Sequence, residues 1–130
     1  MTRNVAIIGA AGLPVRKWQT APGDEIQVLE HEVLAKVVIE AMADAGADKN
    51  DVASLVFAQP RPYTTQKYFA TFMANYLRLP CTGSVVEILG NGMTAALAFE
   101  AAANDIRLGR AKVALALGVN FETATPAVDH

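Results

Sequence analysis

The chain has 130 residues, of which 52% are hydrophobic and 18% are charged, a length and composition that fit one globular domain with its own core. Its formal net charge of −2 offers no electrostatic footprint for nucleic acid, since binding phosphates takes a clustered excess of Lys and Arg. No apolar run approaches the roughly 18 residues of a membrane span, and no signal-like segment is recognisable. The sequence therefore predicts a cytoplasmic protein that binds neither nucleic acid nor membrane.

Cysteine and histidine are scarce, which limits the available chemistry. Cys81 is the single cysteine, so an intramolecular disulfide is excluded. The two histidines, His31 and His130, are too few to complete a Cys/His metal site. We expect no metal and no resident cofactor, and we expect His31 to be a surface or helix-packing residue.

The predicted elements alternate between strands and helices. The strands are short apolar runs, typical of strands buried on both faces, and the helices repeat apolar residues at helical spacing. This order, β-α-β-α-β-α-β, favours an α/β fold with a mostly parallel sheet. In chain order we expect a strand at 4–9, a helix from Asp24 or Glu25 to Gly46, a strand at 51–58, a helix at about 65–77, a strand at 84–89, a helix at about 93–108 and a strand at 112–118.

The last of these helices is apolar on nearly every side. Its apolar residues are spread widely around a helical axis: Met93, Ala96, Leu97, Phe99, Ala101, Ala103 and Ile106. A surface helix would carry a polar face. We therefore expect this helix to be buried between two layers.

Two glycine-bearing turns follow predicted strands, where ligands bind in open α/β sheets. After Gly9-Ala-Ala-Gly12 the chain stays irregular to about Gln27, so a simple turn is favoured over a dinucleotide site, which needs a helix at once. The second turn, Leu89-Gly90-Asn91-Gly92, passes directly into a helix. Its amides and the helix dipole suit a thiolate, an enolate or an oxyanion. The same glycines would equally serve a tight turn and close helix packing alone.

The segments 85–96 and 101–118 resemble the part of thiolases in which a strand leads to Cys-Gly-Ser-Gly or Cys-Ala-Ser-Gly, then a buried helix, then a strand rich in Val and Ala. The runs 4–9 and 41–52 resemble the family's opening strand and its first helix end with the strand after it. The chain is thus similar to the N-terminal domain of the thiolase superfamily, closest to the sterol-carrier-protein (lipid-transfer-protein) type. The resemblance implies a thiolase-like layered fold over 1–130, incomplete relative to a full thiolase.

The resemblance fails at the nucleophile. Aligning Gly92 with the last glycine of the family motif puts Leu89 where thiolases carry the acylated cysteine, and a one-residue gap would put Gly90 there. Neither side chain can attack a thioester. Cys81 lies before the predicted strand, more than about 20 Å from the motif at about 3.3 Å per residue, so we expect an apolar filler. The family's acid/base groups from its C-terminal half have no match in this chain.

The resemblance implies a protein that handles acyl-CoA thioesters in carbon–carbon bond cleavage or formation, either acetyltransferase-like or retro-aldolase-like. Gly90, Asn91 and Gly92 would bind the substrate, and coenzyme A would arrive as its thioester rather than as a cofactor. The alternative is a non-catalytic thiolase-like subunit that binds acyl-CoA or supports a partner, which leaves open whether the chain is an enzyme. Thiolases pair through the strand equivalent to 84–89, so a homodimer or a related accessory subunit is expected.

Overall fold

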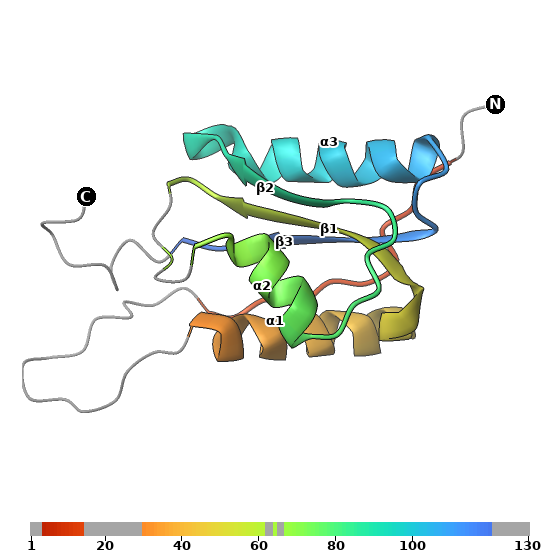
Figure 1. Cartoon of the computed structure of the whole chain (residues 1–130), viewed down its shortest axis with the longest axis horizontal. Helices are drawn as coiled ribbons and strands as arrows, with labels where there is room; N and C mark the ends of the chain where they lie inside the picture. Colours follow the sequence, from red (N-terminus) through yellow and green to blue (C-terminus); the bar gives the residue numbers. More distant parts are fainter. Residues whose placement is uncertain (1–3, 15–29, 62–63, 65–66, 121–130) are drawn as a thin grey trace, which may run out of the picture.

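A computed structural model describes residues 4–14, 30–61, 64 and 67–120 (Figure 1). It confirms an α/β fold in which helices alternate with strands. The predicted helix start at Asp24 or Glu25 and the terminal His130 lie outside the described residues, and α2 begins later than expected. The elements are α1 (Glu30–Ala45), β1 (Val52–Gln59), α2 (Phe69–Tyr76), β2 (Val85–Leu89), α3 (Thr94–Arg107) and β3 (Val113–Gly118), with short 3-10 turns η1 (Lys49–Asp51) and η2 (Asn91–Met93).

The sheet is parallel, as predicted, and its strand order is β2-β1-β3. β1 occupies the centre, where Leu55 pairs with Val85 on one side and Leu115 on the other. A central strand is covered on both faces, and β1 suits this position because seven of its eight residues are buried and most of them are apolar. β2 and β3 form the edges of the described sheet.

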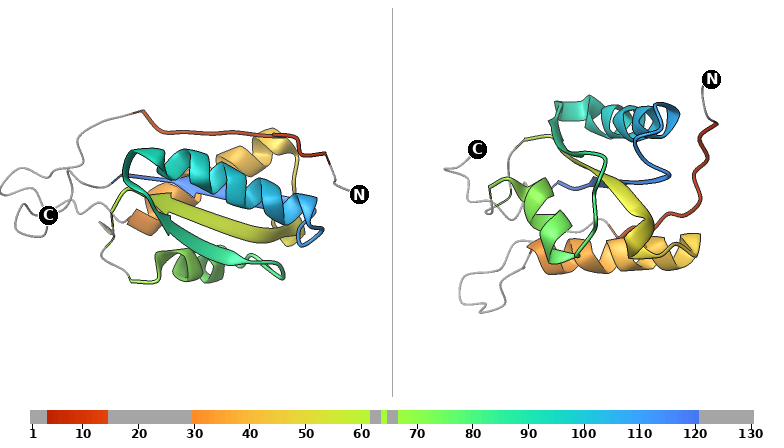
Figure 2. Two further views of the ribbon diagram at one scale, coloured as in Figure 1. Left: turned by 90° about the horizontal axis from the view of Figure 1, so that it is seen from above. Right: turned by 45° about the vertical axis from the view of Figure 1, so that its right-hand side comes forward.

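Helices cover both faces of the sheet, in three layers (Figures 1 and 2). α1 and α2 pack on one face, where Phe57, Phe69 and Met73 belong to the larger apolar core. His31 on α1 contacts the ring edges of Phe72 and Tyr76 on α2, with centroid separations of 5.5 and 4.9 Å. The expected helix-packing role of His31 is therefore confirmed.

α3 packs on the opposite face, but only one side of it is buried. Ala98 and Ala102 pack against Val56 and Ala58 of β1, and their small side chains allow the helix to approach the sheet closely. Phe99 is 56% exposed and Ala96 is also exposed. The predicted burial of this helix on every face is thus wrong for the described chain, because no further layer covers its outer side.

Residues 4–14 are extended but form no strand, so the predicted strand at 4–9 is wrong for this structure. Ile7 is 77% exposed. The segment lies against α1, since a Cβ on Gly9 would come within 2.7 Å of the Ala45 Cβ, and the Ala10 amide donates to Asp44 Oδ2 at 3.0 Å. A mainly apolar groove of about 760 Å³ lies between this segment and β3. Residues 4–14 do not pair with β3 or with any other strand of the described sheet.

Candidate functional site

A pocket of about 740 Å³ opens where the three parallel strands end. Residues 58–61 line it from the end of β1, residues 118–120 line it from the end of β3, and Asn91, Gly92, Thr94 and Ala95 line it from the β2–α3 turn. Parallel strands bring their carboxyl ends to one edge, which is where open α/β sheets bind ligands. Of the predicted substrate-binding residues, Asn91 and Gly92 line this pocket and Gly90 does not.

Most of the polar groups in the β2–α3 turn are used to hold the turn itself. The Gly90 amide donates to Thr94 Oγ1 at 3.1 Å, and the Asn91 amide donates to the Pro60 carbonyl at 3.3 Å. Thr94 Oγ1 in turn donates to the Asn91 carbonyl. Three backbone amides, those of Gly90, Asn91 and Gly92, are predicted to bind substrate. Among the described residues, the Gly92 amide is the one that takes no part in these hydrogen bonds. An oxyanion site at this turn therefore depends on the Gly92 amide.

The two glycines of the turn have different surroundings. A Cβ on Gly90 would lie 3.0 Å from Leu97 Cδ1, so this glycine allows α3 to pack closely. A Cβ on Gly92 would meet nothing within 4 Å. Close packing thus accounts for Gly90, whereas Gly92 leaves open space beside the pocket.

The position that the resemblance to thiolases aligns with their nucleophile carries no reactive group. Leu89 is the last residue of β2, pairs with Gln59 on β1 and is 53% exposed. It does not line the pocket, and the described lining contains no cysteine or histidine. An acyl-enzyme through these side chains is therefore excluded.

Cys81 lies at the other end of the sheet, as predicted. Its amide donates to the carbonyl of Val52, the first residue of β1. The side chain is half-buried against the larger core, and burial raises the pKa of the thiol, which lowers the thiolate fraction at neutral pH. Cys81 is a packing residue.

A hydrogen-bonded pair, the buried Gln59 and the partly buried Glu87, lies at the pocket wall and was missed by sequence reasoning. Gln59 lines the pocket and is 1% exposed, and its Nε2 donates to Glu87 Oε1 at 2.9 Å and to Thr64 Oγ1 at 3.3 Å. The sequence does carry a signal for this pair: Gln59 is a polar residue at the end of the mainly apolar β1, and Glu87 is the one charged residue of the apolar β2. These bonds fix the Gln59 side chain in the wall.

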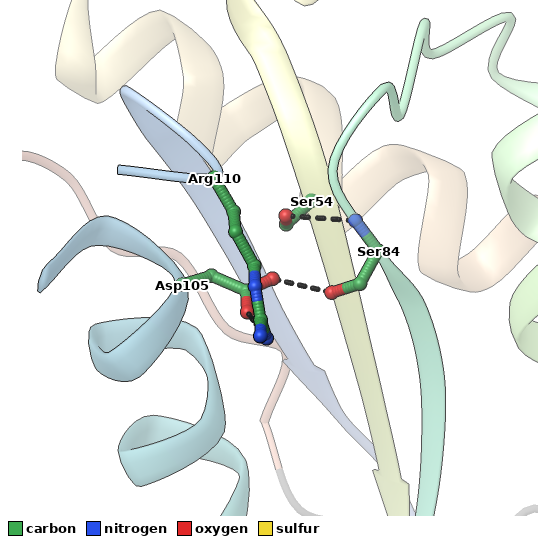
Figure 3. A network of polar contacts seen from close by, with 4 residues as sticks. All are labelled: Ser54, Ser84, Asp105 and Arg110. Carbon is green, nitrogen blue, oxygen red and sulfur yellow. Dashed lines mark hydrogen bonds and ion pairs between the residues drawn. The ribbon is translucent and has the colours of Figure 1, made fainter. Parts of the chain in front are cut away.

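A second polar network lies at the amino ends of the strands (Figure 3). Ser84 Oγ donates to Asp105 Oδ2, the Ser84 amide donates to Ser54 Oγ at 3.1 Å, and Arg110 Nη1 lies 3.5 Å from Asp105 Oδ1. The group links α3 to β1 and to the start of β2. It is remote from the pocket, and its evident role is to hold these elements together.

A comparison with known protein families found no family model that matches the chain, and no curated protein sequence matches it. Within the described residues, no cluster of three or more His, Cys, Asp or Glu side chains could hold a metal ion. In that same part of the chain, no helix has both the length and the apolar character to cross a membrane.

Proposed function

We propose that this chain is a thiolase-like domain that binds an acyl-CoA thioester in the pocket at the carboxyl ends of its strands, in the service of carbon–carbon bond cleavage or formation. The observation that carries the proposal is the pocket of about 740 Å³ beside Gly92, at the strand-to-helix turn that resembles the thiolase motif.

The pocket offers polarisation of a thioester rather than covalent attack. α3 carries no acidic residue in its first turn, so the positive end of its dipole is not offset there. Together with the Gly92 amide, it favours negative charge developing on a thioester oxygen. A retro-aldol cleavage of a β-hydroxyacyl thioester fits this arrangement, because it needs enolate stabilisation and a base but no acyl-enzyme.

The lining also favours a second candidate, a non-catalytic subunit that binds acyl-CoA or supports a partner. Neither a thiol nor an imidazole lines the pocket among the described residues, so the acid/base groups of any reaction have to come from elsewhere. Turnover by the chain together with a candidate partner would distinguish an enzyme from a scaffold.

Binding is tested by isothermal titration calorimetry of acetyl-CoA into the wild-type chain and into Gly92→Leu. A leucine here introduces no clash at its Cβ and extends into the open space, so we expect affinity to fall by at least about tenfold. Gly12→Leu is the matched control, because a Cβ on Gly12 also meets nothing within 4 Å and this residue lines the other groove.

Circular dichroism establishes that each variant is folded before the titrations are compared. Wild-type affinity in a folded Gly92→Leu variant, or the absence of acetyl-CoA binding by the wild type, would overturn the proposal. Equal losses in Gly92→Leu and Gly12→Leu would place the ligand outside this pocket.

A further inference from the structure

We propose that the ligand of this pocket presents an anionic oxygen group, a carboxylate or a phosphate, to Arg61. This inference rests on the proposed function, in which an acyl-CoA thioester occupies the pocket, and it adds a chemical requirement on the ligand. Arg61 contributes the one charged side chain among the described residues that line the pocket.

The backbone next to Arg61 is held at the pocket. Arg61 follows Pro60 directly after the end of β1. The Pro60 carbonyl accepts a hydrogen bond from the Asn91 amide at 3.3 Å, which ties the loop after β1 to the β2–α3 turn. This hydrogen bond links two walls of the pocket next to Arg61, which is exposed.

Among the described residues, no carboxylate forms an ion pair with the guanidinium of Arg61. The ion pair that does occur in this part of the chain joins Arg110 to Asp105 at the opposite end of the sheet. The carboxylate of Glu87 on β2 accepts from Gln59 Nε2 instead. The described lining of the pocket thus carries one positively charged side chain, that of Arg61.

The remaining polar lining complements an anion. Asn91 carries a side-chain amide, and Gly92 contributes its backbone amide, so each can donate a hydrogen bond. Arginine forms paired, charge-assisted hydrogen bonds with both carboxylates and phosphates. No carboxylate lines the described pocket to repel such a group.

An acyl-CoA offers this chemistry from two sources, the phosphates of the coenzyme and a carboxylate on the acyl chain. Three probes separate them by calorimetry. Butyryl-CoA carries phosphates without an acyl carboxylate, succinyl-pantetheine carries the carboxylate without phosphates, and butyryl-pantetheine carries neither. Each is titrated into the wild type, into Arg61→Gln and into Lys112→Gln, which removes an exposed positive charge just before β3, outside the pocket lining.

We expect Arg61→Gln to weaken the binding of butyryl-CoA, of succinyl-pantetheine or of both by about tenfold, the effect of losing one charge-assisted contact. Lys112→Gln should bind all three probes like the wild type, and butyryl-pantetheine should not distinguish Arg61→Gln from the wild type. The affected probe identifies the source of the anion.

Equal affinity of the wild type and a folded Arg61→Gln variant for all probes would overturn the inference while leaving the proposed function standing. An equal loss with butyryl-pantetheine would also overturn it, because the substitution would then act on the pocket's shape rather than on an anion. If the wild type bound none of the three probes, both the inference about Arg61 and the proposed function would be overturned.

Discussion

Asp105 provides the most direct test of how the tertiary structure is held together (Figure 3). Its side chain is 7% exposed, accepts a hydrogen bond from Ser84 Oγ and pairs with Arg110 across 3.5 Å. We consider Asp105→Asn, which removes the charge at nearly constant shape, and Asp105→Ala, which removes the acceptor as well.

The expected magnitudes follow from these contacts. A hydrogen bond to a charged group contributes about 1.5–3 kcal/mol. The Arg110 side chain is 61% exposed, so the ion pair adds only about 0–1 kcal/mol. We expect Asp105→Asn to lower the free energy of unfolding by about 1–2 kcal/mol. Asp105→Ala should cost about 3 kcal/mol, since it also leaves the Ser84 hydroxyl without this acceptor.

The effect should depend on pH with a defined sign. Burial alone would raise the pKa of Asp105, but the hydrogen bonds from Ser84 and Ser54 and the nearby Arg110 charge together bring the pKa below its ordinary value of 3.8. A carboxylate with a lowered pKa in the folded state stabilises the protein above that ordinary value, and the contribution is lost as pH falls through the folded-state pKa. The difference in unfolding free energy between wild type and Asp105→Asn should therefore have its largest value at about pH 6 and be smaller below about pH 3.

Urea denaturation followed by circular dichroism at both pH values measures this difference. Asp51→Asn is the matched control, because Asp51 is exposed at the end of η1 and its substitution should change stability by less than about 0.5 kcal/mol. The reasoning would be refuted by a difference between wild type and Asp105→Asn that is the same at both pH values, or by a loss no larger than that of the control.

Three further outcomes are expected. In Leu89→Cys, the new thiol should react with iodoacetamide faster than Cys81 in the folded protein, because position 89 is 53% exposed whereas burial raises the pKa of Cys81; an equal rate would show that position 89 is covered. Gly83→Ala should lower the unfolding free energy by about 1–3 kcal/mol, because its Cβ would lie 2.4 Å from Ser54 Oγ; unchanged urea stability would contradict this packing. Sedimentation should reveal self-association through the β2 edge that Val86→Lys weakens, since a charge on an edge strand opposes pairing, whereas a wild-type monomer at micromolar concentration would count against the predicted dimer.

Much of the fold was contained in local patterns of the sequence. The runs around β1, β2 and β3 are apolar on both faces, which only a covered sheet accommodates, and the intervening helices force parallel connections. The glycine turn after β2 could also be located in advance, and with it one wall of the pocket. Such features depend on a few neighbouring residues, whose periodicity and backbone freedom can be read directly.

Other features depended on which segments meet in space. Gln59 and Glu87 are 28 residues apart, yet parallel pairing of β1 with β2 lets them share a hydrogen bond. The apolar run at 4–9 has the pattern of a strand, but it packs on α1 across a groove from β3. Phe99 has the pattern of a core residue and is exposed because none of the described elements covers it. An apolar pattern indicates that a side chain favours burial. Which partner buries it is decided by packing between segments that are distant in the sequence. For this reason only the tertiary structure determined these positions.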